Sequence, residues 1–64
     1  MAKYNVFYKF GDRVAGTKGF YVGMKGKVIG MKRPLFGDDQ FFVKFDEVEV
    51  PVWVDSWDLW YDKN

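Results

Sequence analysis

The fold of this chain is decided by the stretch Gly19-Phe20-Tyr21-Val22-Gly23-Met24-Lys25-Gly26-Lys27-Val28. Three glycines divide it, with aromatic residues between the first two and the β-branched pair Val28-Ile29 after the third. Glycine accepts positive φ angles and close backbone approach more readily than any other residue. The stretch therefore predicts a loop tip, a tight turn and the start of a strand. The G-K-[ST] ending of a phosphate-binding loop is missing, which favours backbone turns over a phosphate site.

Short strands are predicted on both sides of this stretch, separated by turns rich in Gly, Pro and Asp. The expected strands are 4–10, 13–15, 25–32, 40–45, 51–55 and 59–61, with a single 3₁₀ turn at 56–58. Alternation within them predicts which side chains point inward. Those are Tyr4, Val6, Tyr8, Phe10, Val14, Val28, Phe41, Val43, Phe45, Val52 and Val54. Phe42, Lys44 and Trp53 are expected to point outward, and Gly30 predicts a bulge or bend.

The pattern as a whole predicts an all-β protein, because no window shows a sustained helical period. Five to six short antiparallel strands are typical of a small barrel. A chain of 64 residues forms one domain, residues 1–64. Its core is expected within 10–61, with the strand 4–10 packed on it. The large aromatic content, 22%, supplies core volume that so short a chain otherwise lacks.

The central stretch resembles the KOW type of SH3-like barrel. That motif reads G-x-aromatic-x-G-x-x-G-x-V, and Gly19, Tyr21, Gly23, Gly26 and Val28 occupy its positions. The resemblance implies a small barrel that contacts nucleic acid or other proteins of the transcription and translation machinery.

Flanking segments extend the resemblance over residues 10–61. Gly11-Asp12-Arg13-Val14 resembles the G-D-x-V that opens such barrels, and residues 41–46 resemble their x-x-V-x-F-D strand. Val52, Val54 and Leu59 resemble the closing hydrophobic positions. The loop 33–39 is longer than the family pattern, and KOW domains usually belong to larger proteins, whereas we expect this barrel to stand alone.

Catalysis is poorly supported by the residue types present. The chain has no His and no Cys, one serine (Ser56) and one threonine (Thr17), so histidine acid–base chemistry and nucleophilic triads are unavailable. We therefore expect no enzymatic activity, no metal and no cofactor. The acidic residues Asp46, Glu47 and Glu49 are interpreted as a solvated turn.

No signal peptide or membrane-spanning run is visible, which predicts a cytoplasmic protein without a membrane partner. A small-molecule substrate is not expected, and the predicted state is a monomer, with a dimer as the alternative.

Charge is distributed unevenly, although the net charge is only +1. Residues 1–33 hold eight Lys/Arg and one acid, a net of +7, whereas residues 34–64 hold two lysines and eight acids, a net of −6. Such asymmetry between halves predicts a basic binding surface. The alternative is that a barrel interleaves its halves and the charges pair across strands.

The first functional hypothesis is a nucleic-acid-binding module built around the basic and aromatic residues of the central loop. Cations bind phosphates, and exposed rings stack on bases. The predicted residues are Arg13, Lys18, Phe20, Tyr21, Lys25, Lys27, Lys32 and Arg33. The alternative is that the rings of Phe20 and Tyr21 pack into one end of the barrel core and the lysines are solvated.

The second hypothesis is a stand-alone adaptor or inhibitor that binds another protein, such as a bacterial or bacteriophage accessory protein. Exposed aromatic residues are common anchors of protein interfaces. The predicted anchors are Phe42, Trp53, Trp57 and Trp60, beside an acidic surface in the second half of the chain. The alternative is that the strand 4–10 covers these rings.

Overall fold

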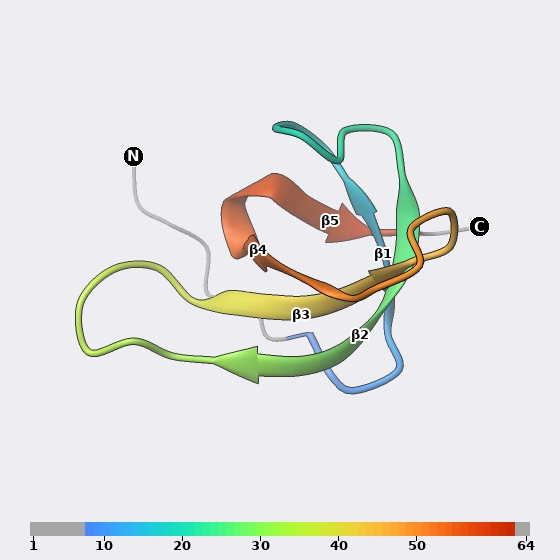
Figure 1. Ribbon diagram of the computed structural model, residues 1–64. Helices are drawn as coiled ribbons and strands as arrows, with labels where there is room; N and C mark the ends of the chain where they lie inside the picture. The colour runs from blue at the N-terminus through green and yellow to red at the C-terminus, as the bar shows by residue number, and fades with distance from the viewer. Residues whose placement is uncertain (1–7, 63–64) are drawn as a thin grey trace.

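The computed structural model describes residues 8–62 as five antiparallel strands in one sheet (Figure 1). The strands are β1 (Arg13–Gly16), β2 (Lys25–Lys32), β3 (Gln40–Phe45), β4 (Val52–Asp55) and β5 (Leu59–Tyr61), with the 3₁₀ turn η1 (Ser56–Asp58) before β5. Their order in the sheet is β4-β3-β2-β1-β5. The described residues are therefore all-β, as predicted, and contain no α-helix.

The core lies on one face of this sheet, which we call the inner face. Buried side chains come from every strand and from the segment before β1: Tyr8, Val14, Val28, Phe41, Val43, Phe45, Val54 and Leu59. Tyr21, Met24, Val48 and Val52 pack against them. The predicted inward positions in β1 to β4 are confirmed, because strict alternation turns every second residue of a strand to the same face.

Tyr8 joins this core from outside the strands. Its ring makes edge-to-face contacts with Phe41 and Tyr61, each at a centroid distance of 4.8 Å. Burial, followed by the nearby Tyr61, raises the pKa of Tyr8 to about 12. Its hydroxyl has no hydrogen-bond partner among the described residues.

A bulge in β2 changes the alternation of that strand. Val28 pairs with Val43, but Gly30 rather than Ile29 pairs with Phe42, so β2 has one extra residue here. In a regular strand, residues an odd number of positions apart, such as Lys27 and Lys32, point to opposite faces. The extra residue brings them to the same face. The bulge predicted from Gly30 is confirmed.

Two glycines of the central stretch meet different backbone requirements. Gly26 pairs with Phe45 across β2 and β3, and a Cβ there would lie 2.6 Å from the Lys44 carbonyl oxygen. Gly23 instead has a φ of +83°, in the left-handed region. Its N–H donates to the Gly16 carbonyl (2.9 Å), which closes the loop between β1 and β2. The predicted turn and strand start are thus present.

Element boundaries follow the predictions closely, with small shifts. The ranges 25–32, 40–45, 56–58 and 59–61 match, β1 extends one residue further, and β4 begins after Pro51, which has no N–H to donate to a ladder. Most of the predicted strand 4–10 lies outside the described residues, and residues 8–10 are not in a strand.

Phe10 is a correction to the predicted inward set, because its side chain is 76% exposed. The chain reverses here: the Asp12 N–H donates to the Lys9 carbonyl (2.9 Å), and the Lys9 N–H donates to Asp12 Oδ2 (2.9 Å). This turn takes Phe10 away from the sheet before β1 begins.

Candidate functional site

Three cations form a row across the outer face of the sheet, opposite the core. Arg13 on β1 is the direct partner of Lys27 on β2, and Lys27 is the direct partner of Lys44 on β3. Direct partners in an antiparallel pair point to the same face, with Cβ atoms roughly 5 Å apart. We call these three residues the basic row. Two of its members were predicted site residues, whereas Lys44 was predicted only as an outward side chain.

Asp46 neutralises one end of the basic row. Both of its carboxylate oxygens accept hydrogen bonds from the Arg13 guanidinium, at 3.0 and 2.7 Å. This contact lowers the pKa of Asp46 and raises the pKa of Arg13. Among the described residues, neither Lys27 nor Lys44 forms an ion pair, that is, a contact within 4.0 Å between its ammonium and a carboxylate. The Lys44 ammonium donates instead to the Phe45 carbonyl oxygen (2.8 Å). Both lysines are close enough to Asp46 to help lower its pKa, so this one carboxylate serves all three cations of the basic row.

An aromatic pair lies beside the basic row on the same face. Phe42 on β3 pairs with Trp53 on β4, and their rings stack with centroids 4.6 Å apart and planes 26° apart. The Lys32 ammonium lies 4.6 Å from the Trp53 ring centroid, within cation–π range. We call Lys32, Phe42 and Trp53 the aromatic stack. It joins residues from the two sets that were predicted as separate sites.

The other predicted nucleic-acid residues lie in different surroundings. Lys18 sits over the Trp57 ring at 5.9 Å, and Tyr21 stacks on the core residue Phe45 at 4.9 Å. Phe20 is exposed and touches Tyr21 edge to face. The central loop therefore offers a ligand the ring of Phe20, because the ring of Tyr21 serves the core.

Lys25 and Arg33 are engaged in ion pairs with acids of the second half of the chain. Lys25 lies 3.8 Å from Asp62, and Arg33 lies 3.3 Å from Asp39. Together with the Arg13 pair, these contacts support the alternative in which charges of the two halves pair across the sheet. The basic surface that remains is smaller than the +7 of residues 1–33 suggests.

The predicted protein-interface residues do not form one patch. Trp57 belongs to η1, whereas Trp60 on β5 pairs with Ala15 and meets Tyr61 edge to face at 5.4 Å. Trp60 and Trp53 lie on strands at opposite ends of the sheet order. Within this set, Phe42 and Trp53 are the neighbours that the strand register brings together.

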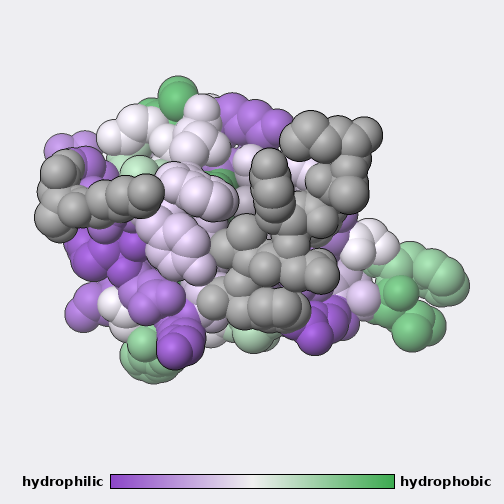
Figure 2. Space-filling view, turned by 180° about the vertical axis from the view of Figure 1, so that it is seen from behind, coloured by the Kyte–Doolittle hydropathy of each residue, from purple (hydrophilic) through white to green (hydrophobic). Residues whose placement is uncertain are grey.

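An apolar loop tip was not among the predicted site residues. The loop between β2 and β3 extends away from the sheet (Figure 1), and a hydrophobic lobe projects from the body there in Figure 2. Leu35 is 91% exposed and Phe36 is 86% exposed. The sequence indicated this loop only by its unusual length, residues 33–39. The length of a loop does not predict which of its side chains are exposed.

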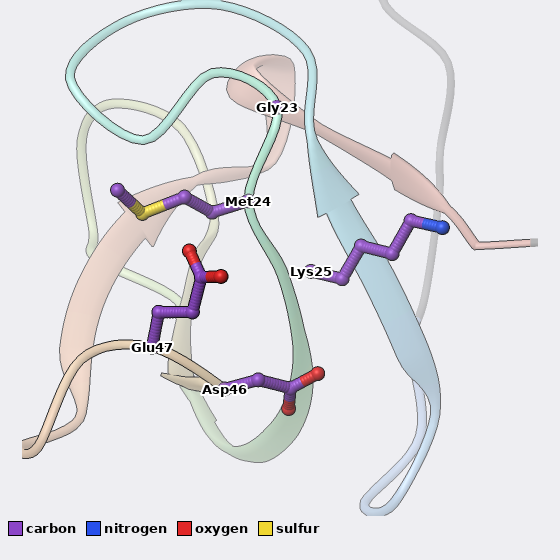
Figure 3. Close-up of a pocket in the computed structure, with 5 residues that line it drawn as sticks. All are labelled: Gly23, Met24, Lys25, Asp46 and Glu47. Carbon is purple, nitrogen blue, oxygen red and sulfur yellow. The ribbon is translucent and has the colours of Figure 1, made fainter.

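A shallow depression lies between the central loop and the turn after β3. Figure 3 shows its lining residues: Asp46 and Glu47 come from the turn, and the Lys25 side chain points away from Glu47. Its volume is about 180 Å³, below the roughly 300–1,000 Å³ of typical ligand pockets. Residues 8–62 contain no cluster of three or more potential metal ligands. No helix in this part of the chain is long and apolar enough to cross a bilayer.

Comparison with protein-family models, with curated proteins and with solved structures finds no match for this chain. The site is therefore defined by its own geometry: the basic row on β1, β2 and β3, and beside it the aromatic stack on β2, β3 and β4.

Proposed function

We propose that this protein is a small SH3-like barrel of the KOW type that binds nucleic acid through the outer face of its sheet. It acts as a non-enzymatic module in transcription or translation. The barrel assignment is supported by the strand order β4-β3-β2-β1-β5 and by a single 3₁₀ turn between the last two strands. The binding assignment rests on the basic row, three cations on adjacent strands of one face.

The like charges at Lys27 and Lys44 carry this proposal. Direct cross-strand partners of the same sign repel each other, and Asp46 offsets only one of the three positive charges in the basic row. Local conflicts of this kind are expected at functional sites, where a ligand supplies the missing complement. A phosphate backbone is such a complement, because each phosphate carries one negative charge.

The variant Lys27→Glu tests the proposal, because it separates stability from binding. A glutamate there removes the repulsion from Lys44 but also faces the Asp46 carboxylate, so we expect the free energy of unfolding in denaturant titrations to change by less than about 1 kcal/mol. Affinity for a labelled oligonucleotide should fall. The slope of log K against log salt should decrease by about one for each phosphate that the variant no longer binds.

Lys18→Glu is the matched control, since it makes the same charge change at an exposed lysine beside Trp57. We expect it to leave affinity and salt slope near those of the wild type. Equal losses of affinity in both variants would indicate that the central loop, not the outer face, binds the oligonucleotide. Unchanged affinity of Lys27→Glu would refute the outer face as the binding site.

A second candidate function, binding to another protein, is favoured by the hairpin tip, residues 34–37. Leu35 and Phe36 are almost fully exposed, and isolated apolar tips of this kind fit apolar pockets of partners. A photo-reactive phenylalanine analogue at Phe36 should yield a discrete protein adduct in cell extract. The same analogue at Phe10, a comparably exposed phenylalanine, is the control; identical adduct patterns from both positions would contradict a docking role for the tip.

A further inference from the structure

We propose that the aromatic stack is a binding site for an unpaired nucleobase, so that the ligand is single-stranded. This inference rests on the proposed function, because the basic row must hold the backbone beside it. It differs from that function in naming the form of nucleic acid and the side chains that select it.

The stack is assembled by the fold before any ligand binds. Phe42 and Trp53 are held by the register of β3 and β4, and their rings already lie in contact. Gly30 lies opposite Phe42, and a Cβ at Gly30 would come within 3.3 Å of the Phe42 Cβ. The glycine therefore leaves room for Phe42 against β2. Ordering two rings in advance lowers the entropic cost of binding a third.

Trp53 has surface left for a ligand. Its contacts within the stack come from Phe42 on β3 and Lys32 on β2, which lie on the same side of β4 in the sheet order. No described strand pairs with the other side of β4, and the Trp53 side chain is 43% exposed. A planar group can therefore reach the exposed part of the indole at the edge of the sheet, and it can stack on the ring where the flexible Lys32 side chain moves aside.

The charge beside this ring indicates the kind of planar group. Lys32 provides a cation next to the indole, and Lys27 and Lys44 follow on the same face. Flat rings interleaved with cations match a strand in which bases alternate with phosphates. Bases in a duplex have their faces covered by their neighbours, so only an unpaired base can use the ring.

The polar residues of the same face are compatible with this ligand. Gln40 is the partner of both Lys32 and Asp55, so an amide and a carboxylate form the next row beside the stack. Such groups hydrogen-bond the edges of bases. Asp55 also disfavours phosphate at that row, which directs the backbone toward the lysines.

The experiment compares the affinity of the protein for single-stranded oligo(dT) of about 12 nucleotides with its affinity for a duplex of the same length. Both are measured by fluorescence anisotropy at the same low salt concentration. We expect the wild type to prefer the single strand. Trp53→Leu should reduce single-strand affinity about 10- to 100-fold, the size of one stacked base, while its duplex affinity stays unchanged. Trp53→Phe keeps a ring and should retain most of the affinity.

Trp60→Leu is the matched control, because Trp60 is also 43% exposed but lies on β5 at the other end of the sheet order. It should bind as the wild type does. Equal affinity for both ligands with no effect of Trp53→Leu would overturn the stacking site and leave the proposed function intact. Absence of binding to either ligand would overturn both.

Discussion

At the scale of single residues, the Arg13–Asp46 pair connects the first strand to the turn after the third. Two parallel hydrogen bonds hold it, although both side chains are about half exposed. Such bidentate contacts are the surface ion pairs with the best-defined geometry. The pair also positions the basic row, because Arg13 is the end of that row.

This pair predicts how stability depends on pH. The Arg13 contact lowers the pKa of Asp46 below its ordinary value of 3.8, so its stabilisation is present above that pH and disappears as the pH falls through the lowered value. We expect Asp46→Asn to be less stable than the wild type at pH 7, with the two stabilities converging at strongly acidic pH. Denaturant titrations across this range measure the difference.

Glu47→Gln is the control for this prediction, because it removes a carboxylate from the same turn and leaves the Arg13–Asp46 pair in place. A stability difference between Asp46→Asn and the wild type that stays constant from neutral to acidic pH would contradict the account.

At the scale of elements, alternation predicted β3 with its buried and outward residues, because the side-chain period of a strand is a local property. The same reasoning could not predict which faces the side chains of β2 take. Gly30 predicted an irregularity, but only the observed register tells that Lys27 and Lys32 share a face. The contact between Lys32 and Trp53 joins β2 to β4 across the intervening β3, so no single stretch of sequence contains it.

The candidate site was accordingly predicted in fragments. Most of its residues were named, but they were divided between a basic loop and an aromatic interface, and Lys44 belonged to neither. The error at Phe10 has a related cause: the parity of residues 4–10 assumes an extended chain, whereas the Lys9–Asp12 turn ends it early. Turn hydrogen bonds through side chains compete with strand pairing in ways that periodicity does not reveal.

At the scale of the whole molecule, the two oppositely charged halves interleave in one sheet. Acids of the second half pair with Arg13, Lys25 and Arg33, which consumes part of the positive charge of the first half. Of what remains, Lys27 and Lys32 lie on the outer face, where Lys44 of the second half joins them, whereas Lys18 lies over Trp57. A net charge of +1 therefore coexists with a local basic surface, and the proposed binding is expected to be moderate and sensitive to salt.

The most direct test of the proposed binding face is a titration of isotope-labelled protein with oligo(dT), followed by amide and indole N–H chemical shifts. The chain has three tryptophans, so each indole reports on a different place. We predict that the Trp53 indole and the amides around Lys27, Lys32 and Lys44 shift, while the Trp57 and Trp60 indoles do not. Shifts confined to the Trp57 indole and the loop between β1 and β2, with Trp53 unmoved, would contradict the outer face as the binding surface.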